Sequence, residues 1–251
     1  MDSFFDKIME NIFIESNLSL GKIRYIEESY EIDTYIYIAH KPNSDYFIYV
    51  NLPARVLSYV TNDIQITISS LIKNDLDSLF LINGDELYVS SSFDKNSTLI
   101  IFSTQESGVD DPIGRQVISI EEDPYFFKKQ VLVVDNMDVR IIYDNFNKNI
   151  NKYTLYLQKI ISNPSLFNEF MNSNPLKTSN KVKEYSFVAK LYEKLPFLSL
   201  SVIKSTPEDL QNNIDKELSI YEKKLCKTIL ELDPNNLEDW FNEITEEETD
   251  A

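Results

Sequence analysis

Two apolar segments separated by a short polar turn place the strongest constraint on the fold of this 251-residue chain. Residues 33–40 and 46–52 are rich in Tyr, Ile and Val, the aromatic and β-branched residues that favour strands. The intervening sequence KPNSD, at 41–45, contains the Pro, Asn and Asp that are typical of turns. The sequence therefore predicts a β-hairpin over residues 33–52.

The rest of the first half mixes helical and strand-like patterns. Phe and Ile recur every three or four residues over 3–15, which predicts an amphipathic helix. Further elements follow from apolar spacing and turn residues: strands at 22–28, 98–103 and 116–121, a helix at 62–80, and a loop from Gly108 to Gly114.

The second half reads as helical throughout. Helices are expected over 151–172, with a break at Pro164, and over 179–195, where Pro196 ends the helix. Residues 206–232 predict the longest helix, because Thr206 and Pro207 suit its start and an apolar stripe follows. The stripe consists of Leu210, Ile214, Leu218, Tyr221, Leu225, Ile229 and Leu232.

These elements predict an α+β protein with two parts. Residues 1–145 form a mixed helix and sheet domain, and residues 146–251 form a helical region that ends in an acidic tail. The polar stretch NFNKNIN, at 145–151, marks the expected boundary.

Composition excludes several kinds of chemistry. His40 and Cys226 are the only residues of their types, which removes most zinc, disulfide and thiol-catalysis hypotheses. The region from Gly108 to Gly114 has five residues between its glycines, whereas a P-loop has four and a following lysine. The net charge of −17 argues against a large duplex-binding surface. We therefore expect no catalytic residues, no metal and no cofactor.

The N-terminus and the apolar runs bear on location. Acidic residues precede any basic residue in MDSFFDK, unlike a secretory signal. No apolar run approaches the ~18 residues of a membrane span. We expect a cytoplasmic protein with no membrane contact.

The expected order over residues 3–103, which is helix, three strands, helix and strand, resembles the core of restriction-endonuclease-like folds. Such enzymes resemble one another in an acid on the second strand, and in an acid, a spacer and a lysine on the third. Here the second strand offers at most Asp33, and the third, YFIYVN at 46–51, has neither an acid nor a lysine. This resemblance implies the fold without the nuclease chemistry.

One short segment combines acidic, aromatic and basic residues in an unusual order. Residues 121–131 read EEDPYFFKKQV, in which Asp123 could cap a helix that begins at Pro124. The rings could pack into the core at this helix start, or form an exposed patch that contacts a partner. The residues concerned are Tyr125, Phe126, Phe127, Lys128 and Lys129.

Together with FDKNSTLII at 93–101, this segment resembles the middle component (family 1) of ABC-three-component systems, the group that includes the small subunit of Lamassu-type defence complexes. Gln130 departs from the family's pattern, which has a tyrosine there. The resemblance implies a non-catalytic subunit of an anti-phage or anti-plasmid complex. It would bridge an SMC- or Rad50-like ABC ATPase and an effector, often a nuclease, and would meet nucleic acid only through that complex.

Further hypotheses accompany this interpretation. Leu218 and Leu225, in the stripe of the long helix, are candidate contacts to the ATPase. One alternative is a stand-alone metal-dependent nuclease that uses carboxylates, and another is an acidic inhibitor that mimics nucleic acid. The carboxylates available to the nuclease alternative are Asp110, Asp111, Glu121, Glu122 and Asp123.

Overall fold

The structure is a computed structural model of the full chain. It describes residues 4–42, 45–84, 87, 89–90, 93–105, 112–149, 152–173, 178–200, 218–219 and 221–223. The chain divides into two compact units, Met1–Leu200 and Ser201–Ala251. The elements described below all belong to the first unit.

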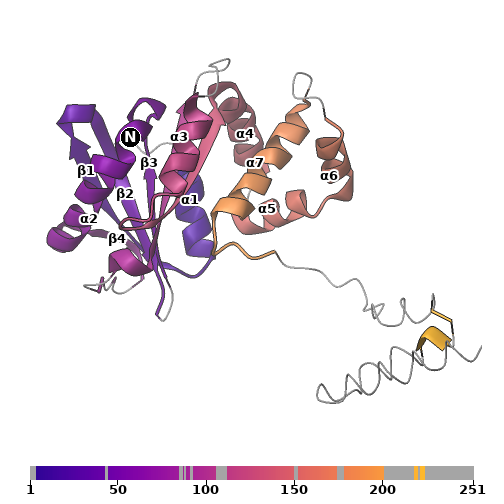
Figure 1. The fold of residues 1–251 in the computed structure, drawn as a ribbon, viewed down its shortest axis with the longest axis horizontal. Helices are drawn as coiled ribbons and strands as arrows, with labels where there is room; N and C mark the ends of the chain where they lie inside the picture. Colours follow the sequence, from indigo (N-terminus) through magenta and orange to yellow (C-terminus); the bar gives the residue numbers. More distant parts are fainter. Residues whose placement is uncertain are drawn as a thin grey trace, which may run out of the picture. The chain divides into compact units, whose positions relative to one another are not determined.

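A mixed β-sheet organises the first unit (Figure 1). In the described residues the strand order is β4-β1-β2-β3-β5-β6. Strands β4, β1, β2 and β3 pair in antiparallel fashion, whereas β5 lies parallel to β3 and β6 lies parallel to β5. The strands are β1 (Ser19–Glu27), β2 (Ile32–His40), β3 (Tyr46–Asn51), β4 (Phe80–Asn83), β5 (Ser97–Gln105) and β6 (Lys128–Asp135).

Helices cover both faces of this sheet (Figure 1). The α-helices are α1 (Phe4–Glu15), α2 (Gln65–Asn74), α3 (Pro112–Glu121), α4 (Asn136–Asn149), α5 (Tyr153–Ile161), α6 (Pro164–Met171) and α7 (Asn180–Lys194). A 3-10 helix, η2 (Ala54–Tyr59), and a π-helical turn, η3 (Val60–Ile64), lead directly into α2.

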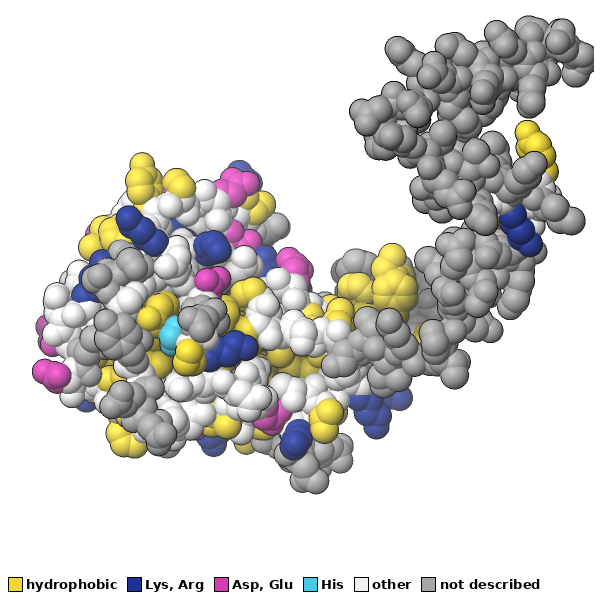
Figure 2. All heavy atoms as spheres, turned by 90° about the horizontal axis from the view of Figure 1, so that it is seen from below, with side chains coloured by type: hydrophobic (Ala, Val, Ile, Leu, Met, Phe, Trp, Pro, Cys, Tyr) yellow, Lys and Arg dark blue, Asp and Glu magenta, His cyan; other side chains and the backbone are white. Residues whose placement is uncertain are grey.

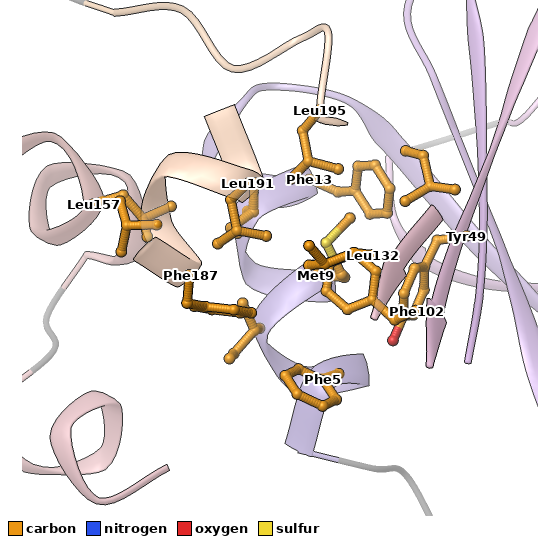
Figure 3. Close-up of a cluster of buried hydrophobic side chains, with 14 of the residues drawn as sticks. Phe5, Met9, Phe13, Tyr49, Phe102, Leu132, Leu157, Phe187, Leu191 and Leu195 are labelled. Atoms are coloured by element: carbon orange, nitrogen blue, oxygen red, sulfur yellow. The ribbon is translucent and has the colours of Figure 1, made fainter. Parts of the chain in front are cut away.

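Side chains alternate between the two faces of each strand, so the sheet separates two hydrophobic cores. On one face, α1 packs on Tyr49, Phe102 and Leu132, α7 packs on β6, and α5 contacts both helices (Figure 3). On the other face, Ile48, Leu99 and Ile101 of the strands meet the inner sides of α2 and α3, forming the second core. The first face is thus covered by two layers of helix.

The α+β class predicted from the sequence is confirmed. The helix at 3–15, the hairpin at 33–52, the strand at 98–103 and the helix at 179–195 all appear as expected. The helix at 151–172 is indeed broken at Pro164, which begins α6. The order of helices and strands over residues 3–103 is also present, with β4 inserted before the last strand.

The strand predicted at 116–121 is wrong, because these residues belong to α3. Val117, Ile118 and Ile120 are β-branched, and this local preference suggested a strand. However, Ile113, Val117 and Ile120 recur at helical spacing, and all three pack toward the second core. The loop predicted from Gly108 to Gly114 is wrong at its end, because α3 begins at Pro112, while residues 106–111 lie outside the described part.

The helix predicted at 62–80 ends at Asn74, and residues 80–83 form β4 instead. Strand β6 and helix α4 were not predicted. Residue 145 lies inside α4, and elements on both sides of it contribute to the same core. The helix predicted at 206–232 lies outside the described residues, apart from 218–219 and 221–223.

Candidate partner-binding surface

The connection between α3 and β6 holds the segment that combines acids, aromatics and lysines. Residues 123–127, here called the aromatic loop, form a series of bends between the two elements. Phe126 adopts a left-handed backbone conformation with φ of 61°, which is rare for a bulky side chain. The segment was expected to start a short helix or a sharp turn after a strand; it forms bends and no helix, and it follows a helix and not a strand.

Lys129 fixes the shape of the aromatic loop. Its side chain is fully buried (0% exposed), and its ammonium nitrogen lies 2.7 Å from a carboxylate oxygen of Asp123. The same nitrogen donates to the backbone carbonyls of Asp123 (3.0 Å), Tyr125 (2.6 Å) and Phe127 (3.1 Å). A buried ammonium has three protons to place, and this loop supplies acceptors for all of them. The loop is therefore folded around a lysine.

Asp123 balances the charge of this lysine. Its carboxylate also accepts a hydrogen bond from the side-chain amide of Gln65 at 3.0 Å. Desolvation acts to raise the pKa of Asp123, but the hydrogen bonds from Lys129 and Gln65 outweigh it, so the pKa lies below its ordinary value. The ionised pair thus joins β6, the aromatic loop and the start of α2.

The two outer rings of the aromatic loop face solvent. Tyr125 is 68% exposed and Phe126 is 42% exposed, whereas Phe127 is 2% exposed and belongs to the second core. Of the two alternatives raised for these rings, packing into the core holds for Phe127, whereas Tyr125 and Phe126 lie on the surface, where a partner could contact them. Exposed aromatic rings on a fixed backbone are typical of protein contact surfaces.

The adjacent lysines differ in the same way. The Lys128 side chain is exposed and lies 4.0 Å from Asp45, a separation that contributes little at the surface. Lys128 lines a cavity of about 820 Å³ together with Phe126 and Lys95. Of the five partner contacts predicted in this segment, Phe127 and Lys129 are internal, which corrects that hypothesis. Tyr125, Phe126 and Lys128 remain on the surface.

A second hollow lies beside the aromatic loop, between α3 and η3. This outer groove has a volume of about 530 Å³. Its lining residues are Thr61, Asn62, Arg115, Ile118, Ser119, Glu122, Asp123 and Tyr125. Ile118 is 56% exposed, although it is a large aliphatic residue on a helix.

Two further exposed apolar side chains, Tyr59 and Ile66, lie three residues before and four residues after Asn62. Tyr59 ends η2, and Ile66 lies in the first turn of α2. The ring of Tyr59 stacks on Tyr30 with a centroid separation of 4.5 Å. Sequence analysis missed this surface because it assigned 116–121 to a strand. Helical spacing of Arg115, Ile118, Ser119 and Glu122 is the signal that could have revealed it.

Two of the carboxylates that the nuclease alternative requires, Glu121 and Asp123, are engaged in other contacts. Glu121 accepts hydrogen bonds from Lys194 at 2.8 and 2.9 Å and from the backbone of Val131 at 2.8 Å. Asp123 is paired with Lys129, and Asp110 and Asp111 lie outside the described residues. No cluster of three potential metal ligands occurs among the described residues.

Asp33, the one acid expected on the second strand, is also neutralised. It accepts two hydrogen bonds from the guanidinium of Arg24, at 3.0 and 2.8 Å, on the surface of β1 and β2. The hydrogen bond and the charge of Arg24 hold the pKa of Asp33 below its ordinary value. His40, beside the hairpin turn, stacks on Tyr46 with a centroid separation of 4.0 Å.

A further cavity, of about 850 Å³, lies where β5 and β6 end, beside α4 and α7. Its Lys183 and Asp138 form an ion pair of 2.6 Å, so their charges neutralise each other.

In the described part of the chain, every helix is too short or too polar to cross a membrane. Leu218 is half-buried within the few described residues of the second unit, and Leu225 lies outside the described residues.

The fold and these surfaces define an α+β protein that presents a fixed aromatic loop and a groove beside it. Residues 54–158 match the sequence model of the ABC-three component (ABC-3C) system Middle Component 1 family. This match confirms the resemblance noted for residues 93–131, and it extends from η2 into α5. It therefore includes the aromatic loop and both walls of the outer groove. No curated protein and no solved structure matches the chain significantly.

Proposed function

We propose that the protein is a non-catalytic assembly subunit of an ABC-three-component defence complex. In this role it bridges an SMC- or Rad50-like ABC ATPase and an effector, often a nuclease, in the cytoplasm. The observation that carries the proposal is the match of residues 54–158 to the middle-component family. A Lamassu-type complex acting against phage or plasmids is the particular system that we infer, and it meets nucleic acid only through the ATPase and the effector.

The geometry of the aromatic loop supports a contact role. Phe126 and Tyr125 expose apolar surface, yet their backbone is fixed by the buried ammonium of Lys129. A rigid exposed ring loses little conformational entropy on binding, which is why aromatic residues dominate binding hot spots. We assign Tyr125, Phe126 and Lys128 to a partner contact, and Leu218 and Leu225 to a second contact with the ATPase.

The face of the molecule in Figure 2 argues against the nucleic-acid mimic. On its described surface, acidic side chains are interspersed with lysines, arginines and hydrophobic residues. A mimic of a phosphate backbone would instead require a continuous row of acids.

Co-expression with a candidate SMC- or Rad50-like ABC ATPase tests the proposal. The wild-type chain should retain the ATPase on affinity purification, and Phe126→Glu should reduce the retained ATPase by about 10-fold or more. Phe167→Glu is the matched control, because Phe167 is similarly exposed on α6, far along the chain from the aromatic loop. If the wild-type chain retains no ATPase, the proposal fails.

A nuclease assay of the purified chain separates the two remaining classes. Metal-dependent DNA cleavage that persists through repurification, and that Glu121→Gln or Asp123→Asn abolishes in a folded variant, would favour the nuclease alternative.

A further inference from the structure

The outer face of α3 is self-complementary in charge. Arg115, Ile118, Ser119 and Glu122 are spaced three, one and three residues apart, so they form one face of the helix. Glu122 continues the helical geometry, because its amide donates to the carbonyl of Ile118 at 2.9 Å. All four side chains line the outer groove.

The two charges on this face lie symmetrically about the midpoint between Ile118 and Ser119. Seven residues separate them, which corresponds to about 10 Å along a helix. Both side chains are exposed. Within the part of the chain that the structure describes, neither of them makes an ion pair or a side-chain hydrogen bond.

A second copy of the same helix face matches this symmetry. A two-fold axis through the midpoint places a second α3 antiparallel to the first. Arg115 of each copy then lies opposite Glu122 of the other, and both ion pairs form at once. The axis passes beside Ile118, the exposed aliphatic residue, and Ser119, whose small side chain allows two helices to approach closely.

We propose that the outer groove is a two-fold self-association surface, in which α3 of a second copy of this chain lies against α3 of the first. The inference goes beyond the proposed function, because it needs no ATPase or effector. Its consequence is a dimer that carries two aromatic loops and can engage two partner sites at once.

Sedimentation equilibrium of the full chain over a concentration series tests the proposal. The wild-type chain should show a reversible monomer–dimer equilibrium. Arg115→Glu should raise the dimer dissociation constant by about 10-fold or more, because it loses both ion pairs and creates two like-charge contacts. Glu122→Arg should have a similar effect.

The combined variant, Arg115→Glu with Glu122→Arg, is the decisive arm. It restores both ion pairs with reversed polarity, so its dissociation constant should return to within about 3-fold of the wild type. Arg140→Glu on α4 is the matched control, because it changes the net charge equally at another exposed position. Ile118→Glu should abolish dimerisation, whereas Leu155→Glu, at an exposed leucine of α5, should not.

Three results would overturn the proposal: a wild-type chain that is monomeric throughout, a dimer that the single charge reversals leave unchanged, or single reversals that the combined variant does not rescue. Circular dichroism of each variant excludes unfolding as the cause. The test is independent of the ATPase, so failure here leaves the proposed function intact, and failure of ATPase binding leaves the dimer intact. If Ile118→Glu weakens ATPase binding in a monomeric wild-type chain, the groove belongs to that partner instead.

Discussion

The two faces of the sheet are covered to different depths. On one face, α1 and α7 pack on the sheet, and α5 lies against both of these helices. On the other face, α2 and α3 pack on the sheet with their inner sides, and Ile66 and Ile118 on their outer sides are exposed. The first face, here the deep face, carries two layers of helix, and the second, here the shallow face, carries one; each encloses a hydrophobic core.

The largest expected effect sets the two faces against each other. Phe102 is fully buried on the deep face, where its ring contacts Phe5 and Tyr49 at centroid separations of 5.6 and 5.2 Å. Phe102→Ala should lower the free energy of unfolding by about 3–5 kcal/mol. Ile118→Ala, on the shallow face, should change it by less than about 0.5 kcal/mol. Urea unfolding measures both. Equal losses would show that the groove is part of the core.

The second effect contrasts two neighbouring lysines at the start of β6. Lys129→Met removes a buried ammonium and leaves the Asp123 carboxylate and three carbonyls without their donor. We expect a loss of about 3 kcal/mol in the free energy of unfolding. Lys128→Met should cost less than about 0.5 kcal/mol, because that side chain is exposed. A stable Lys129→Met variant would mean that the aromatic loop keeps its shape without the lysine.

This pair of lysines also shows where sequence reasoning stops. The dipeptide KK among aromatics suggested a basic surface patch, since lysines are rarely buried. The burial of Lys129 depends on Gln65 and Asp123, which lie 58 residues apart in the chain, and on backbone carbonyls whose directions only the folded loop defines. By contrast, α1 and the β2–β3 hairpin follow from local periodicity and turn residues, and both were predicted.

The same limit explains the missed groove. Residues 116–121 contain three β-branched residues in a row of six, and a strand prediction divides Arg115, Ile118 and Glu122 between opposite faces or beyond its ends. Only the helical conformation brings these three side chains onto one face. The family resemblance could be predicted, because it depends on residue identity, but the surface that results could not.

A third, smaller effect concerns the hydrogen bonds that join α1 to the start of α5 on the deep face. The Glu15 carboxylate, at the end of α1, accepts hydrogen bonds from the backbone of Tyr153 (2.8 Å) and Thr154 (2.7 Å) and from the Thr154 hydroxyl (2.6 Å). It thus caps the first turn of α5, where a negative charge is favourable. Glu15→Gln should cost about 1 kcal/mol in the free energy of unfolding. Glu28→Gln, at an exposed glutamate after β1, is the control. Hydrogen exchange at the start of α5 should accelerate in Glu15→Gln alone.

The smallest effect is the pH dependence of the ion pair that shapes the aromatic loop on the shallow face. The pKa of Asp123 is lower in the folded chain than its ordinary value of 3.8. A lowered folded pKa means that the unfolded chain binds the proton more tightly, so the pair contributes stability above about pH 4 and loses it as the pH falls through the folded pKa. Asp123→Asn should therefore be less stable than the wild type at pH 7, and this difference should shrink as the pH is lowered below 4.

In the Lys129→Met background, where the lysine that lowers this pKa is absent, the difference in stability between the proteins with and without Asp123→Asn should depend less on pH. Urea unfolding of the four proteins across the acid range measures this coupling. If the difference between wild type and Asp123→Asn widens toward low pH, the carboxylate is not held ionised by Lys129, and the account of how the loop keeps Tyr125 and Phe126 on the surface must change.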